Sequence, residues 1–350
     1  MADASLPVTY VEGFHDKEAV QRMTYNPLGG TGMKPSVISY GASALGSVFR
    51  ETNNSESHQV VKYLIRNGIN YIDVAPWYGH GKGETVLGEG LQGVPREAYY
   101  VTTKVGRYFP EPERMFDFRA ERTIQSVDES LQRLGLEYVD VIQVHDMEFA
   151  PNLDIIVNET LPALQKVKES GKARFIGITG YPLGNFRKVL ERSTVKIDTI
   201  LTYCHACLND NSLAEHLPYF KEKGVGVVNA SPIGMGLLTD RGPASWHPAQ
   251  QEVKDSCAKA AAYCREKGVD ISRLALAFSH RQDIPTTLFS TASLVNAKKN
   301  LDCYYTPLTD LEEQTSREVI EKFMKPLNNK DWEGIEVNKY WDALKSKPDN

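Results

Sequence analysis

Short runs of β-branched and aromatic residues alternate along the chain with longer stretches in which apolar residues recur about every 3.6 positions. This alternation is typical of strand–helix units around a parallel sheet. Eight repeats in one chain favour a closed α/β structure, the (β/α)8 TIM barrel, over an open sheet. The predicted strands lie at residues 36–41, 70–75, 99–104, 139–144, 173–179, 197–203, 224–230 and 286–291.

The clearest helical stretch runs from residue 120 to residue 135. Ile124, Val127, Leu131 and Leu134 share one face of it, and Gly135 supplies a stop. Similar patterns predict helices at residues 55–68, 161–172, 212–224, 255–268 and 293–301.

One domain can hold all eight repeats, because 350 residues of which 41% are apolar suffice for a single large core. We assign the barrel to residues 23–325, between an N-terminal extension, 1–22, and a polar C-terminal tail, 326–350, at whose start the core is expected to stop. A Gly-rich turn at residues 29–32 predicts an N-terminal hairpin that caps the bottom of the barrel. The Pro- and Gly-rich linker at 231–250 suits a lid or a cofactor strap.

Charge and composition exclude several classes of partner. The formal net charge is -5, with 40 basic and 45 acidic residues spread along the chain, so no basic stripe is available for nucleic acid. The N-terminus lacks the apolar core of a signal peptide, and no apolar run approaches the roughly 18 residues of a membrane span. We therefore expect a cytoplasmic protein with no membrane partner, whose five cysteines are reduced.

Polar side chains with complementary chemistry stand at the ends of three successive predicted strands. Asp73 and Tyr78 follow the second strand, Lys104 closes the third and His145 follows the fourth. A phenol with a pKa of about 10 exchanges protons poorly at neutral pH unless a cation lowers that pKa. Lys104 can supply the cation, Asp73 can fix it, and His145 can direct a substrate oxygen toward Tyr78. The set predicts a carbonyl-reducing proton donor at the barrel mouth.

Other features have simpler interpretations. A lone Asp73 could cap a helix and a lone Lys104 could be a surface cation, but their matching positions favour catalysis. The Gly-rich run at 79–84 lacks the spacing of a Rossmann phosphate turn and predicts a flexible loop. Cys204 and Cys207 form a C-x-x-C without a second pair, so we expect buried thiols and no metal.

Between about Met23 and Asp302 the chain resembles the aldo-keto reductase family. The similarity is clearest at residues 73–91, 116–146 and 171–180, and Asp73, Tyr78, Lys104 and His145 match the family's catalytic tetrad. Within the family the chain most resembles NAD-linked dehydrogenases of free sugars. The resemblance implies hydride transfer between a nicotinamide and C1 of an aldose, from hemiacetal to lactone, or reduction of a related carbonyl.

The resemblance also implies the cofactor contacts. It assigns them to Gly41, Ala42, Ser43, Asp73, Thr179, Ser231, Pro232, Ile233, Gly234, Met235, Gly236, Leu237, Ser293, Asn296 and Asn300. Gly180 and Leu201 depart from the family's usual Asn and Gln, which predicts a looser grip on the carboxamide. Asn296 stands where NADP-preferring relatives often have Arg, so the chain is expected to use NAD rather than NADP.

The partner is expected to be a small sugar or aldehyde. Its candidate contacts are Trp77, His145, Tyr203, His205 and Asn209. Two alternatives remain open. Lys104 could form a Schiff base, as in aldolases, or the chain could be a cofactor-binding regulatory subunit like the potassium-channel β subunits.

Overall fold

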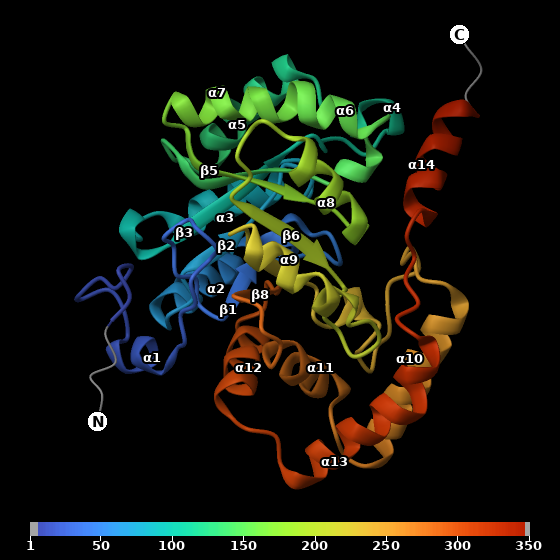
Figure 1. The fold of residues 1–350 in the computed structure, drawn as a ribbon. Helices are drawn as coiled ribbons and strands as arrows, with labels where there is room; N and C mark the ends of the chain where they lie inside the picture. The colour runs from blue at the N-terminus through green and yellow to red at the C-terminus, as the bar shows by residue number, and fades with distance from the viewer. Residues whose placement is uncertain (1–5, 347–350) are drawn as a thin grey trace.

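Eight parallel strands close into a barrel in the computed structural model, which describes residues 6–346 (Figure 1). Each strand pairs with the next, and β8 pairs with β1. Every predicted strand is present, with bounds that differ from the expectation by at most two residues. The strands are β1 (Ile38–Gly41), β2 (Tyr71–Asp73), β3 (Tyr100–Val105), β4 (Val139–Val144), β5 (Ala173–Thr179), β6 (Thr199–Tyr203), β7 (Gly226–Ala230) and β8 (Thr286–Phe289).

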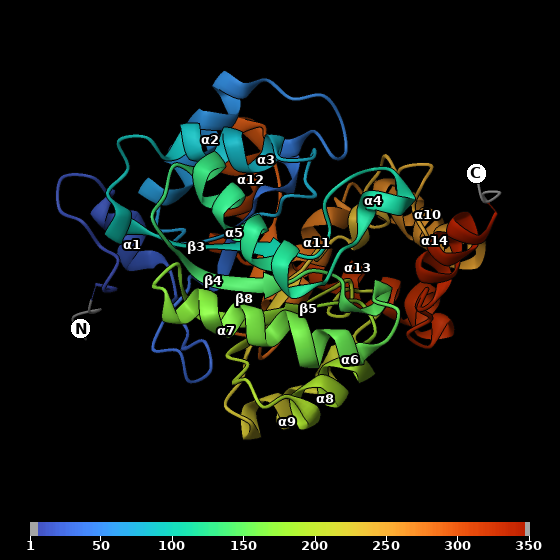
Figure 2. The same cartoon turned by 90° about the horizontal axis from the view of Figure 1, so that it is seen from above.

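Helices surround the barrel, and additional helical segments lie in the loops at its mouth (Figure 2). The α-helices are α1 (Lys17–Arg22), α2 (Asn54–Arg66), α3 (Lys82–Leu91), α4 (Pro112–Met115), α5 (Ala120–Leu134), α6 (Leu153–Ile155), α7 (Leu161–Glu169), α8 (Leu183–Arg192), α9 (Leu217–Glu222), α10 (Gln251–Glu266), α11 (Ile271–His280), α12 (Leu294–Tyr305), α13 (Asp310–Val319) and α14 (Ile335–Lys345). The short 3-10 or π segments are η1 (Ala42–Gly46), η2 (Arg96–Ala98), η3 (Met147–Phe149), η4 (Ile156–Thr160), η5 (Ser212–Glu215), η6 (Gly234–Gly236), η7 (Ile320–Met324) and η8 (Lys325–Leu327). No helix among the described residues is both long and apolar enough to traverse a bilayer.

Helix α5 follows its predicted pattern with one exception. Val127, Leu131 and Leu134 are buried, whereas Ile124 is 37% exposed, so the predicted apolar face was one residue too wide. Gly135 ends the helix in the left-handed conformation, with φ of 66°, as a C-terminal glycine commonly does.

The prediction of a flexible loop at residues 79–84 was wrong, because α3 begins at Lys82 within that run. The helix contains further glycines that allow close packing. A Cβ atom at Gly88 would lie 2.6 Å from the Leu134 carbonyl oxygen of α5. The glycines in this region therefore permit backbones to approach, which local composition alone cannot distinguish from flexibility.

The N-terminal hairpin closes the bottom of the barrel, as predicted. Tyr25 and Ser36 form an antiparallel bridge, and the backbone N–H of Leu28 donates to Met33 O over 3.0 Å. Leu28 and Met33 are fully buried in the cluster of apolar residues inside the barrel. Gly29 is required at the turn, because a Cβ atom there would meet Gly226 N at 2.3 Å.

The apolar core continues beyond residue 325, contrary to expectation. Leu327 and Trp332 are buried in a second cluster that also contains residues of α10 and α11. Helix α14 follows and contacts α4 and η3 at the mouth. Figures 1 and 2 both show α4, α10 and α14 at the end of the molecule away from α1. The C-terminal segment therefore helps to enclose the mouth of the barrel.

Candidate active site

The fold brings the four predicted catalytic side chains together at the carboxyl ends of β2, β3 and β4. Lys104 Nζ lies 2.5 Å from Asp73 Oδ1 and 3.2 Å from Tyr78 Oη. The Tyr78 and His145 rings meet edge to face, with centroids 6.0 Å apart. Adjacent parallel strands end at one rim, and this places residues distant in sequence within contact distance.

A buried network fixes the orientation of Lys104. Its ammonium also donates to Val74 O over 2.9 Å, so all three hydrogens have acceptors. Gln143 Nε2 donates to Asp73 Oδ2 over 3.0 Å and so holds the second carboxylate oxygen. Gln143 was not among the residues predicted for this site, although a polar residue within the otherwise mostly apolar strand 139–144 is a signal of such a role.

Burial and Lys104 act on the Tyr78 phenol in opposite directions. Burial raises the pKa of Tyr78, Lys104 lowers it, and burial is the larger effect. For Lys104 itself, burial lowers the pKa, but Asp73 and Tyr78 raise it above its ordinary value. The ammonium is therefore retained, and the phenol carries its proton in this state. Lys104 therefore lowers the pKa of the phenol, as expected, but burial raises this pKa by more.

His145 is a neutral imidazole at physiological pH. Burial, together with nearby Lys104 and Arg107, lowers its pKa to about 3 against the opposing effect of Asp146. Within the described part of the chain, Nδ1 of this ring has no hydrogen-bond partner. His145 can therefore contact a ligand without introducing a second positive charge beside Lys104.

The backbone around Tyr78 is held by a close contact with η1. A Cβ atom at Gly46 would lie 2.3 Å from the Tyr78 carbonyl oxygen, and one at Gly79 would lie 2.3 Å from Gly46 O. Gly83 N donates to the same Tyr78 oxygen over 2.9 Å. These glycines let two loops touch and thereby set the position of the phenol.

Arg107 and Asp146 form a second ion pair beside the tetrad. Arg107 Nη1 lies 2.6 Å from Asp146 Oδ2, and its guanidinium lies 4.1 Å from the ring centroid of Trp77. Asp146 N donates to Thr179 Oγ1 over 3.0 Å, which ties the ends of β4 and β5 together. The sequence predicted Trp77 and Thr179 but neither charged residue, because nothing local marks Arg107 as part of the site.

The backbone of the predicted cofactor strap is irregular and changes direction repeatedly. Ser231, Gly234, Met235 and Gly236 all have positive φ. Beside it, both side-chain amide atoms of Asn209 are buried without a partner among the described residues. A Cβ atom at Gly234 would lie 3.4 Å from Asn209 Oδ1, so this amide faces the strap. An unpartnered buried amide beside an irregular glycine-rich segment fits a polar ligand.

The other predicted cofactor residues lie at the ends of β1 and β8. Gly41 closes β1, Ala42 begins η1, and Ser43 Oγ donates to Ser290 Oγ over 3.0 Å. Ser293 caps α12, which carries Asn296 and Asn300. At this helix start, Leu294 N donates to Glu56 Oε1 over 2.8 Å. Glu56 was not predicted, because it comes from α2, far away in sequence.

The predicted substrate contact His205 is engaged by the protein itself. Its Nδ1 lies 2.8 Å from Asp210 Oδ2 and its Nε2 lies 2.8 Å from Tyr181 O. Neither nitrogen is left for a sugar hydroxyl, so the geometry does not support that assignment. Tyr203, by contrast, lines a cavity at the mouth together with residues of the C-terminal segment.

Cys204 and Cys207 are free, buried thiols, as expected. The two Sγ atoms lie 3.9 and 3.2 Å from Ser231 O. Burial raises the pKa of Cys204 well above its ordinary value, which disfavours a reactive thiolate. Among the described residues, no group of His, Cys, Asp and Glu has the arrangement of a metal site.

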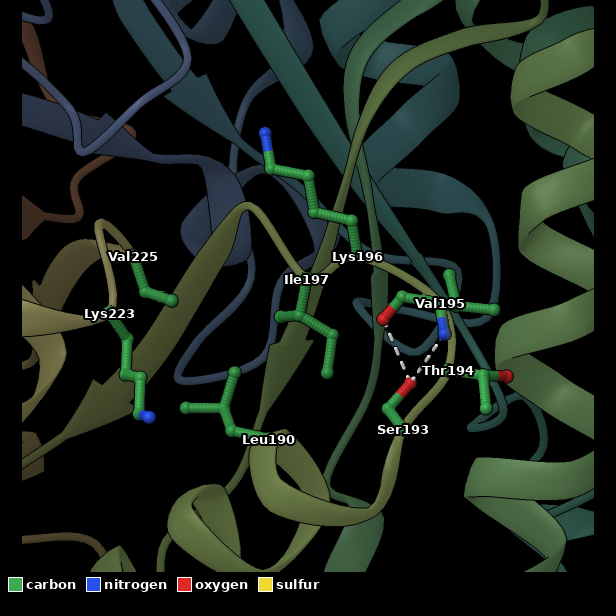
Figure 3. A pocket seen from close by; sticks show the side chains of 8 residues that line it. All are labelled: Leu190, Ser193, Thr194, Val195, Lys196, Ile197, Lys223 and Val225. Atoms are coloured by element: carbon green, nitrogen blue, oxygen red, sulfur yellow. Dashed lines mark hydrogen bonds between the residues drawn. The ribbon is translucent and has the colours of Figure 1, made fainter.

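A hollow on the opposite rim is not part of this site (Figure 3). It lies between the end of α8 and the segments that precede β6 and β7. Ser193 Oγ, its hydroxyl, donates to Val195 O over 2.9 Å and accepts from Val195 N over 3.1 Å. Lys196 is paired with Asp198 over 2.8 Å. These local pairings leave little chemistry for a ligand.

Comparisons with known proteins agree with this geometry. The profile of the Aldo/keto reductase family matches residues 37–321. An L-galactose dehydrogenase of Arabidopsis thaliana is 45% identical over 320 residues, which cover 89% of this chain and 98% of that protein. A D-arabinose 1-dehydrogenase of Saccharomyces cerevisiae is 31% identical over 80% of this chain and 85% of that protein. The solved structure of an aldo-keto reductase from Bacillus halodurans has a TM-score of 0.66 at 26% identity, covering 85% of this chain and 96% of that one.

Proposed function

Because the chain belongs to the aldo/keto reductase family, we propose that it is a sugar 1-dehydrogenase that oxidises C1 of a free aldose, with L-galactose as the first candidate, to the lactone. The family assignment makes the chain an oxidoreductase that works with a nicotinamide cofactor. The choice of sugar follows the similar proteins, which are L-galactose and D-arabinose dehydrogenases.

The contact of Lys104 with both Asp73 and Tyr78 is the observation that carries the proposal. In the direction of oxidation, the proton of the C1 hydroxyl passes to Tyr78 Oη. Lys104, 3.2 Å away, stabilises the phenolate that must exist before this transfer. Asp73 keeps the ammonium in place, and neutral His145 orients the substrate oxygen. The bound nicotinamide supplies the acceptor for the hydride that leaves C1.

Burial serves the same chemistry. Lys104 is 1% exposed and Asp73 is 2% exposed, so water scarcely screens the attraction between them or their action on the phenol. Occupation of the mouth by a positively charged nicotinamide would add a second cation and further lower the pKa of Tyr78.

We propose NAD as the physiological cofactor. The carboxyl group of Glu56 already accepts a hydrogen bond from the first residue of α12, near Ser293 and Asn296. A 2′-phosphate at this helix start would meet a like charge, whereas a ribose hydroxyl can donate to a carboxylate.

The Schiff-base alternative conflicts with the charge of Lys104. An amine must lose its proton before it attacks a carbonyl, yet Asp73 and Tyr78 raise the pKa of Lys104. No observation here favours a regulatory role over turnover.

The proposal is tested with the purified protein and a panel of free aldoses, with NADH formation followed by absorbance. We expect the largest kcat/KM for L-galactose with NAD, and a Tyr78→Phe variant that binds NADH but does not turn over. A protein that oxidises none of the aldoses would refute the proposed function. A kcat/KM for NADP tenfold above that for NAD would refute the cofactor choice.

A further inference from the structure

A cavity at the barrel mouth joins the ends of β4, β5 and β6 to the C-terminal segment. Its walls combine aromatic rings with two carboxyl groups. The lining residues are Glu148, Phe149, Tyr181, Pro182, Tyr203, Trp332, Gly334, Glu336 and Val337.

Glu148 has one carboxyl oxygen with a partner and one without. Oε1 accepts from Tyr181 N over 2.9 Å, whereas Oε2 is shielded from solvent and has no partner among the described residues. Leaving a buried polar atom unpaired is unfavourable. Such an atom at a cavity wall points to a ligand group that completes its hydrogen bonding.

Gly180 creates the space for this carboxyl group. A Cβ atom at Gly180 would lie 2.6 Å from Glu148 Oε2, so any larger residue would displace the carboxyl group from the end of β5. Burial, reinforced by nearby Asp146, raises the pKa of Glu148 well above its ordinary value. The protonated carboxyl group can both donate and accept, as a sugar hydroxyl does.

The cavity adjoins the catalytic residues. Glu148 follows His145 by three positions in the same loop. The Arg107 guanidinium lies 4.1 Å from the Trp77 ring centroid and 5.4 Å from that of Phe149, so it bridges the wall near Tyr78 and the wall of the cavity. The cavity therefore lies beside Arg107 and Asp146, which adjoin the tetrad.

The opposite wall comes from the C-terminal segment. The Trp332 and Tyr181 rings stack with centroids 4.8 Å apart, and Trp332 Nε1 is a second buried atom without a described partner. Because these two ring faces cover each other, this wall offers a sugar hydroxyl the edge of Trp332, where Nε1 can donate.

Resting on the proposed function, we propose that Glu148 determines specificity: its carboxyl group hydrogen-bonds a sugar hydroxyl remote from C1, within a subsite closed by Tyr203 and Trp332. Glu148 contacts the substrate but takes no part in the proton or hydride transfer. A polyhydroxylated substrate satisfies Oε2, whereas a simple aldehyde leaves it unpaired.

The test compares Glu148→Ala and Glu148→Gln with the wild-type protein on three kinds of substrate. These are L-galactose, its deoxy analogues at the carbons remote from C1, and a short aliphatic aldehyde reduced with NADH. Wild type should prefer L-galactose over one analogue by tenfold or more, because a site built around a hydroxyl discriminates against its absence. The kcat/KM of Glu148→Ala for L-galactose should fall by about the same factor. Its kcat/KM for that analogue should equal that of the wild-type protein. Glu148→Gln, which keeps a donor and an acceptor, should restore much of the loss.

Two controls separate this role from a structural one. NADH affinity, thermal unfolding and turnover of the aliphatic aldehyde should be unchanged in Glu148→Ala. The exposed Glu333, in the same segment as Trp332, supplies a matched Glu333→Ala variant that should behave as wild type on every substrate.

The outcomes distinguish the two proposals. If Glu148→Ala keeps wild-type kcat/KM on L-galactose, or loses the same factor on all substrates including the aldehyde, the assignment of Glu148 is overturned while the dehydrogenase activity stands. If wild type oxidises no aldose, the proposed function itself is refuted.

Discussion

A methyl group added at Gly46 should displace Tyr78 through a clash with its backbone. The Cβ atom of Gly46→Ala would lie 2.3 Å from the Tyr78 carbonyl oxygen. Ordinary contacts between heavy atoms are about 3.5 Å, so the two loops must separate by roughly 1 Å. A displacement of that size in a reacting group can cost on the order of 100-fold in rate. We therefore expect kcat to fall by about 100-fold, while the dissociation constant of NADH, measured by fluorescence titration, changes little.

Gly184 supplies the matched control for this variant. It lies in α8 with ordinary backbone geometry, and a Cβ atom there would have no neighbour within 4 Å. Gly184→Ala should keep wild-type kcat and, as a Gly→Ala change in a helix, should not lower the melting temperature. Wild-type kcat in Gly46→Ala would show that the contact between these loops does not position Tyr78.

Four further predictions concern charge and protonation. Tyr78→Phe should lower kcat by about 10²–10⁴-fold with NADH binding retained, and near-normal turnover would contradict its acid–base role. Lys104→Met leaves the Asp73 carboxyl group buried without its cation, so it should destabilise the fold by about 3–5 kcal/mol in denaturant titrations, and an unchanged midpoint would contradict the pairing. Glu56→Gln should lower the ratio of kcat/KM for NAD to that for NADP by about fivefold. This factor corresponds to ~1 kcal/mol of repulsion between like charges in a solvated setting. An unchanged ratio would show that Glu56 does not select the cofactor. Burial lowers the pKa of His280 to about 4, so the unfolded chain binds its proton first and stability falls as pH drops from about 6.5 toward 4. His280→Asn should flatten this fall in unfolding free energy, and an unchanged slope would show that the ring is not buried neutral.

Local pattern was sufficient to predict the barrel and the meeting of the four tetrad side chains at one rim. Strands at 139–144 and 173–179 were placed without error, because a buried parallel strand is a short apolar run between polar segments. The tetrad could be located because the residues at the carboxyl ends of neighbouring strands must meet at one rim.

Local pattern was not sufficient where the meaning of a residue depends on its neighbour in space. The glycine-rich run at 79–84 suggested flexibility, yet Gly79 and Gly83 serve tight contacts around Tyr78. The segment after residue 325 looked polar, yet Trp332 completes the core by stacking on Tyr181.

The sequence by itself determined the eight strand–helix repeats and which four polar side chains, Asp73, Tyr78, Lys104 and His145, meet at the barrel mouth. Only the tertiary structure decided that Arg107 pairs with Asp146, that Glu56 meets the start of α12 and that Glu148 fills the space left by Gly180. The reason is physical. Strand and helix periodicity follow from hydrogen bonding and burial along a few neighbouring residues, whereas these pairings depend on how distant segments pack around the barrel mouth.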